Sequence, residues 1–197
     1  MTIHRVKLKD LNQEYLEQLK EQTTDGEQEV IIWLSQKYTA LSESAFWKII
    51  NLLDWKKRKT KTIIAAAANE LSKYSVEKIK AFGDILSEKL YLLDGQKYAE
   101  HTGQNAYKGE DAPFSVDGFL YARCMAVAKG QVCYEEILKH PEKMVKDDSF
   151  EPLLCLGSLA YQKKTNKLYD HIPAYIYETF ANTKAWNNKD FLSNLLS

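Results

Sequence analysis

The sequence predicts a mainly α fold, α+β overall, in which a helical domain follows a small strand–helix–strand segment. From about residue 41 onward, apolar residues recur every three or four positions, which is the period of an amphipathic helix. Glycine and proline are scarce, at 8 and 4 residues in 197, whereas an all-β fold needs many turn residues. A chain of this length forms one domain, or one domain with a short added module.

The first forty residues have a different pattern. Residues 4–9 alternate in polarity and residues 29–34 form a β-branched apolar run, so both are predicted strands, with a helix capped by Asn12 between them. We therefore predict a β-α-β segment at 1–40 and a helical domain at 41–197. Two strands alone are marginal in water and their edges need cover. Either the helical domain or a second copy of the chain covers them, and the second alternative predicts a homodimer contact through residues 1–40.

Four serines mark the starts of predicted helices, because a serine hydroxyl satisfies a free backbone N–H in the first helical turn. They are Ser42, Ser75, Ser115 and Ser149. The helix after Ser75 is the clearest, and it ends near Asp94-Gly95. After Ser149 the pattern predicts one helix over residues 150–162 with Leu159 facing inward. Residues 166–185 are predicted to be extended or irregular, with Tyr169, Tyr175 and Tyr177 exposed, and a last short helix follows Asn187-Asn188.

Composition limits the classes of partner and location. Lys and Arg total 27 and Asp and Glu also total 27, so the chain has no long-range field that would draw it to nucleic acid or to an anionic membrane. No stretch approaches the roughly eighteen apolar residues of a membrane-spanning helix, and residues 1–12 lack the apolar core of a signal peptide. We expect no membrane or nucleic-acid partner and, by elimination, a cytoplasmic protein.

The basic run of residues 56–61 after Trp55 has two interpretations. Its cations could contact phosphates while the tryptophan stacks on a base. Alternatively, the run is a solvated loop between two helices, and the overall charge balance favours this second interpretation.

Sequence motifs that carry enzyme chemistry are missing. None of the four histidines stands at the spacing of a metal-binding helix, and the three cysteines lack CxxC spacing. The sequence contains no phosphate-binding loop, no dinucleotide fingerprint and no nucleophile elbow. We therefore expect neither a metal nor another cofactor.

Arg123 is the most informative residue, because it is the only charge in an apolar stretch, residues 118–128. A guanidinium in such a helix either reaches the surface or is buried with a carboxylate partner. The candidate partners are Asp84, Glu88, Asp94, Glu135 and Glu136. The arginine is then either a structural ion pair or part of a charged pocket for an anionic ligand or a partner's carboxylate. Asp117, in the first turn of the same helix, is six residues away and does not share its face.

Several separated motifs in the chain resemble those of one bacterial protein family. They are Phe46–Trp55, Leu71-Ser72 with Phe82, Asp117–Arg123, Gly130, Tyr134-Glu135, Pro141-Glu142, Phe150-Glu151 and Ala160-Tyr161. In this order they resemble the domain-of-unknown-function family DUF4240 over about residues 42–163. The resemblance implies a compact helical domain and bacterial origin, but no reaction. Its signature residues here include Trp47, Asp117, Gly118, Phe119, Arg123, Gly130 and Tyr134.

These observations favour a non-enzymatic binding or regulatory domain, of the immunity-protein or antitoxin kind, that acts on a protein partner. The candidate binding residues are Asp117, Arg123, Glu88, Tyr134 and Trp47, around a cleft near Arg123. The alternative is an enzyme in which Asp117 and Glu88 supply an acid/base carboxylate and Arg123 clamps an anion. A helical domain can bring such residues together without any local motif.

Overall fold

The computed structural model describes residues 13, 17 and 41–186, and the chain divides into two units. One unit is residues 1–36 with residue 196, and the other is residues 37–195 with residue 197. The predicted strands, the homodimer contact and the helix after Asn187 lie outside the described residues. Gln13 and Glu17 have helical backbone, and Gln13 Nε2 donates to Glu17 Oε1 at 3.4 Å.

Within residues 41–186 the chain is mainly helical, which confirms the mainly α prediction. The α-helices are α2 (Glu43–Ile50), α3 (Thr60–Leu71), α4 (Val76–Leu92), α5 (Gln96–Ala99), α6 (Val116–Ala128), α7 (Gln131–Lys139) and α8 (Leu156–Thr165). Short 3-10 turns are η2 (Gly103–Asn105), η3 (Pro141–Lys143), η4 (Glu151–Cys155) and η5 (Thr183–Ala185). No strand occurs in residues 41–186.

Three of the four predicted serine caps are confirmed. Ser42 Oγ accepts a hydrogen bond from the Ala45 amide at 3.2 Å, at the start of α2. Ser75 Oγ accepts one from the Lys78 amide at 3.3 Å, at the start of α4. Ser115 Oγ caps α6 by accepting from the Gly118 amide at 3.0 Å. These hydroxyls satisfy N–H groups that have no partner within the helix, and so they fix where each helix begins.

The fourth cap prediction is wrong, because tertiary contacts determine the backbone around Ser149. The Ser149 amide donates to Asp148 Oδ1 at 2.9 Å, and the Phe150 amide donates to the Tyr121 carbonyl of α6 at 3.0 Å. The chain then forms η4, and α8 begins only at Leu156. With this offset Leu159 is 43% exposed rather than inward-facing.

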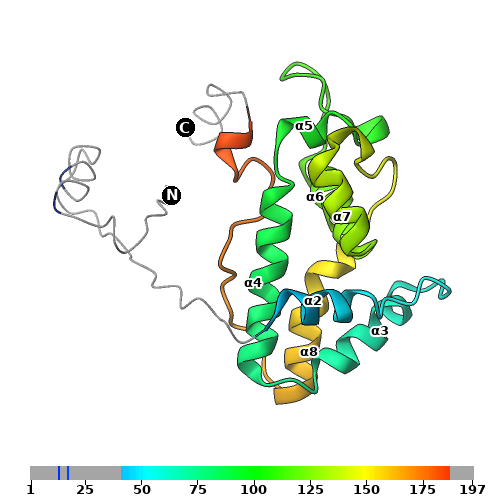
Figure 1. Cartoon of the computed structure of the whole chain (residues 1–197), viewed down its shortest axis with the longest axis vertical. Helices are drawn as coiled ribbons and strands as arrows, with labels where there is room; N and C mark the ends of the chain where they lie inside the picture. Colours follow the sequence, from blue (N-terminus) through cyan, green and yellow to red (C-terminus); the bar gives the residue numbers. More distant parts are fainter. Residues whose placement is uncertain (1–12, 14–16, 18–40, 187–197) are drawn as a thin grey trace. The chain divides into compact units, whose positions relative to one another are not determined.

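The long helix α4, with 17 residues, runs through the helical unit (Figure 1). Helices α6 and α8 both pack against it, α7 packs on α6, and α3 lies along α8. The predicted stripe of α4 is buried, with Ile79, Phe82 and Leu90 at zero exposure. These contacts join helices that are far apart in the sequence into one apolar core.

After α8, residues 167–186 form a segment that we call the strap; it follows α4 as the orange trace in Figure 1. Its backbone is irregular apart from η5, as predicted. The predicted exposure of its tyrosines is wrong. Tyr169 and Tyr177 are half-buried against the core, and the Tyr175 ring stacks near Tyr91 of α4 at 5.3 Å between centroids. The strap is therefore a packed part of the domain.

Candidate functional site

Arg123 lies at the centre of the contact between α6, α4 and the strap, and its side chain is fully buried. Helix α6 is apolar on nearly every side, so the guanidinium has no short path to water. Its Nη1 donates to the Leu90 carbonyl at 2.9 Å and to the Tyr177 carbonyl at 3.0 Å. Its Nη2 donates to Thr179 Oγ1 at 2.9 Å. One side chain thus joins two helices to the strap.

Asp94 is the carboxylate partner of Arg123. The two side chains are both fully buried, with 4.0 Å between Arg123 Nη2 and Asp94 Oδ1. Asp94 accepts hydrogen bonds from the Phe180 amide at 3.1 Å, the Asn182 amide at 2.8 Å and the Trp186 indole N–H at 3.1 Å. We call Arg123 and Asp94 the anchor. Asp94 is one of the five carboxylates predicted as candidate partners.

Burial shifts the pKa values of both anchor groups toward their neutral forms. It raises the pKa of the Asp94 carboxyl, while the Arg123 charge and the strap N–H donors oppose that rise. It lowers the pKa of the Arg123 guanidinium, and Asp94 opposes this. The guanidinium carbon lies 4.8 Å from the centroid of the Phe119 ring, and Nε has no hydrogen-bond partner within residues 41–186. The protein therefore compensates two costly buried charges with strap contacts.

Asp117 and Glu88, the two acidic residues predicted for the binding site, do not contact Arg123. Asp117 is exposed in the first turn of α6. Glu88 is half-buried on α4 and accepts a hydrogen bond from the Tyr175 hydroxyl at 3.2 Å. Across residues 41–186, no hydrogen bond or ion pair links either carboxylate to Arg123.

Tyr134 and Trp47 form a second cluster with Lys89. Their ring centroids lie 5.5 Å apart, and Lys89 Nζ is 5.4 Å from the Tyr134 centroid and 5.9 Å from that of Trp47. Lys89 Nζ also binds the Glu43 carboxylate, and the Tyr134 hydroxyl donates to the Lys89 carbonyl at 3.2 Å. Both rings are almost fully buried. Of the five predicted site residues, these two lie together, separate from the anchor contacts.

A second set of contacts fixes the first half of the strap. Asp84 Oδ1 on α4 accepts from the Ala174 amide at 2.8 Å and lies 2.8 Å from His171 Nε2. Ser87 Oγ accepts from the Tyr175 amide at 3.2 Å. Asp84, one of the predicted partners of Arg123, thus holds the strap at another point of α4. Periodicity could not reveal this, because the strap has no repeating pattern.

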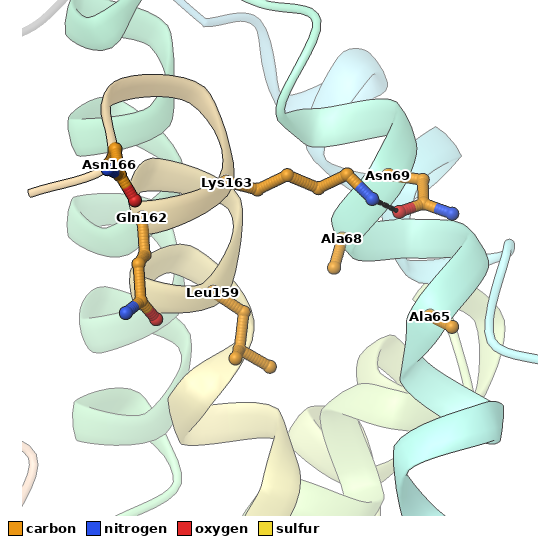
Figure 2. Close-up of a pocket in the computed structure, with 7 residues that line it drawn as sticks. All are labelled: Ala65, Ala68, Asn69, Leu159, Gln162, Lys163 and Asn166. Atoms are coloured by element: carbon orange, nitrogen blue, oxygen red, sulfur yellow. Dashed lines mark hydrogen bonds between the residues drawn. The ribbon is translucent and has the colours of Figure 1, made fainter.

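A shallow surface groove of about 440 Å³ lies between α3 and α8. Figure 2 shows Ala65, Ala68 and Asn69 on one side and Leu159, Gln162, Lys163 and Asn166 on the other. Lys163 Nζ donates to Asn69 Oδ1 across the groove. The anchor residues do not line this groove, so it is a different surface from the predicted cleft.

Metal-binding clusters and membrane-spanning helices are both absent from the described residues. No group of three or more His, Cys, Asp or Glu side chains there could hold a metal ion. No helix in the same ranges is long and apolar enough to cross a membrane.

The fold and the anchor define a small helical domain whose strap is fixed by a buried ion pair. The chain belongs to the family described as protein of unknown function, DUF4240, whose model matches residues 41–163. No curated protein and no solved structure matches the chain significantly. The matched region contains both anchor residues and ends before the strap that they bind.

Proposed function

We propose that the chain is a non-enzymatic protein-binding or regulatory domain, of the immunity-protein or antitoxin kind, which contacts a protein partner through the strap. The supporting observation is that the strap leaves three large aliphatic side chains in solvent. Leu168 is 85% exposed, Ile172 is 64% exposed and Ile176 is 45% exposed. Single exposed aliphatics are ordinary, but three at four-residue intervals on one fixed segment fit a recognition surface.

The anchor supports this proposal by holding the strap rather than by touching the partner. The Arg123 guanidinium has zero exposure, so it cannot reach a partner's carboxylate in this conformation. Its bonds to Tyr177 and Thr179, together with those of Asp84 to His171 and Ala174, fix the strap backbone. A segment fixed before binding loses less conformational entropy when it docks, which strengthens binding.

The enzyme alternative has no comparable support. It needs Asp117, Glu88 and Arg123 to face one substrate cavity, whereas Asp117 is exposed and Arg123 is enclosed by protein atoms. Glu88 has a structural partner in Tyr175. In the binding proposal Arg123 holds the strap through Tyr177, Glu88 contacts it through Tyr175, and Asp117 has no assigned role.

The proposal is tested by capture and then by reconstitution. Immobilised full-length chain is exposed to lysate of cells that express it, and each retained protein is purified and titrated by calorimetry. Because central apolar contacts carry most interface energy, we expect Leu168→Ser with Ile172→Ser to weaken binding by about tenfold or more. Val132, 78% exposed on α7, provides the matched Val132→Ser control. If no protein binds, or if strap and control variants bind equally, the proposal is wrong.

The homodimer contact through residues 1–40 is a separate proposal that rests on the sequence alone, from the need of open strand edges for cover. Size-exclusion chromatography with light scattering on the full chain and on a Leu41–Ser197 fragment tests it. A dimeric full chain and a monomeric fragment support the proposal, and two monomers remove it.

A further inference from the structure

The segment from the end of α2 to the first turn of α3 carries a cluster of exposed positive charges. Its cationic side chains, all exposed, are Lys56, Lys57, Arg58, Lys59 and Lys61. In the part of the chain that the structure describes, none of them forms a salt bridge. We call residues 52–61 the basic loop.

The basic loop also presents two apolar side chains to solvent. Trp55 is 46% exposed and Leu52 is 39% exposed. The Trp55 ring meets Phe150 edge-on, with centroids 4.9 Å apart, so one edge is held by the domain while much of the indole stays free. An exposed tryptophan and leucine beside five cations form an amphipathic tip.

Asp54 holds the backbone of the loop in place. The Asp54 amide donates to the Ile63 carbonyl at 3.0 Å, and the Asp54 carboxylate accepts from the Lys56 amide at 3.1 Å. The Asp54 carbonyl accepts from the Lys57 amide at 3.0 Å. The cations are thus displayed by a defined turn.

The charge balance of the whole chain does not cancel this local field. At physiological ionic strength the Debye length is about 8 Å, so charges on distant surfaces are screened from the loop. Helix α3 begins within the basic loop, at Thr60, and has no acidic residue in its first turn. Its N-terminal dipole adds to the positive potential there. The preference for a solvated loop between two helices rested on the charge of the whole chain, whereas screening makes the local charge decide what this loop attracts.

We infer that the basic loop docks the domain onto an anionic bilayer surface. In Figure 1 the loop projects away from α4 and α8, so it offers a convex tip. A convex tip suits a flat surface, in which Trp55 and Leu52 insert at headgroup depth while the cations meet lipid phosphates. Single-stranded nucleic acid is instead bound in grooves where successive bases stack on several aromatic rings. The basic loop offers a single ring, that of Trp55.

The test uses the full-length chain and sedimenting vesicles of two compositions. One is phosphatidylcholine alone, and the other is an equimolar mixture of phosphatidylcholine and phosphatidylglycerol. A single-stranded thymidine oligonucleotide is the competing polyanion. We expect sedimentation with the anionic vesicles at about 0.1 M salt and release at about 1 M, where the Debye length falls from about 10 Å to about 3 Å.

Two pairs of matched variants separate the loop from general charge and apolarity. The first replaces Lys56, Lys57 and Lys59 by Gln, and its control replaces three exposed lysines elsewhere. The control positions are Lys108, Lys139 and Lys146. The second pair compares Leu52→Ser with Leu92→Ser, since Leu92 on α4 is 43% exposed and Leu52 is 39% exposed.

The loop triple variant should lower the vesicle partition coefficient by tenfold or more, because each cation near an anionic surface adds to the attraction. Its control should stay within about threefold of the wild type, and Leu52→Ser should bind less than Leu92→Ser. Equal loss in variant and control, or sedimentation with neither vesicle, would overturn the inference. Binding to the oligonucleotide without binding to vesicles would also overturn it and assign the loop to nucleic acid.

Discussion

Arg123 Nη2 lies 4.0 Å from Asp94 Oδ1, and neither side chain exposes any surface to solvent. Each charge is also bonded to the strap, Arg123 through Tyr177 and Thr179 and Asp94 through the amides of Phe180 and Asn182. The ion pair is therefore part of the contact that folds the strap onto the helices. Removing either partner should leave an uncompensated charge inside the protein.

Replacing Arg123 by alanine should destabilise the fold strongly. The change leaves the Asp94 carboxylate buried without a cation and leaves the Leu90 and Tyr177 carbonyls without their donor. Loss of one partner from a buried pair costs about 3–5 kcal/mol. Urea unfolding followed by circular dichroism measures the change in the free energy of unfolding.

The matched control is Lys129→Ala, at the end of the same helix. Lys129 is exposed and its Nζ lies 3.5 Å from Asp148 Oδ2, so this pair is screened by water. Surface pairs contribute about 0–1 kcal/mol. Equal effects of the two substitutions would contradict a structural role for the anchor.

Tyr169→Phe should keep or increase stability, although it removes a hydroxyl from the strap. The Tyr169 hydroxyl is buried and has no hydrogen-bond partner among the described residues. A buried polar group without a partner costs about 1–3 kcal/mol, and phenylalanine avoids that cost while filling the same space. Thermal unfolding of the two proteins provides the comparison, and a clear loss of stability would show that the hydroxyl has a partner.

The same hydroxyl should make Gly83→Ala and Gly157→Ala differ. A Cβ at Gly83 would stand 2.7 Å from Tyr169 Oη, whereas one at Gly157 would stand at an ordinary 3.7 Å. Alanine favours a helix over glycine by about 1 kcal/mol, so Gly157→Ala should stabilise and Gly83→Ala should not. Adding Tyr169→Phe should rescue Gly83→Ala but leave Gly157→Ala unchanged. Additive effects in both double variants would argue against this contact.

Stability should fall in acid in part because Glu43 takes up a proton. The hydrogen bond from Lys89 lowers the pKa of the Glu43 carboxyl below its ordinary 4.5 in the folded protein. The unfolded chain therefore binds this proton first, and the stabilisation is complete above pH 4.5 and is lost as pH falls through the folded value. The unfolding free energies of the wild type and of Glu43→Gln, measured at several pH values, should converge as pH falls below the folded pKa of Glu43.

Glu110→Gln is the control for this pH series, since Glu110 is exposed and forms no ion pair within the described residues. Its difference from the wild type should not depend on pH in the same window. A constant gap between the wild type and Glu43→Gln would show that the Lys89 contact contributes nothing to acid stability.

Helices were predicted correctly where a serine cap and an apolar stripe indicated the same helix. Ser75 and the stripe through Phe82 and Leu90 predicted α4, because both signals are local. The predicted cap at Ser149 is wrong because the Phe150 amide donates to the Tyr121 carbonyl, 29 positions away along the chain. No local pattern reveals such a contact. Such tertiary contacts override local propensity.

The candidate site was predictable only in part, because one of its signals is local and its other contacts are tertiary. A lone arginine in an apolar helix indicates a buried charge, and Arg123 is buried with a carboxylate. The choice of Asp94 over Glu88, and the role of the strap, depend on how an irregular segment crosses two helices. Neither periodicity nor charge spacing carries that information.

The most direct test of the anchor is hydrogen exchange at the strap amides in Arg123→Gln and Asp84→Ala. Asp94 accepts from the Phe180 and Asn182 amides, and Asp84 accepts from the Ala174 amide. We predict that Arg123→Gln speeds exchange at residues 180 and 182 before residue 174, and that Asp84→Ala reverses the order. Unchanged protection at residues 180 and 182 in Arg123→Gln would contradict the claim that the buried ion pair holds the strap.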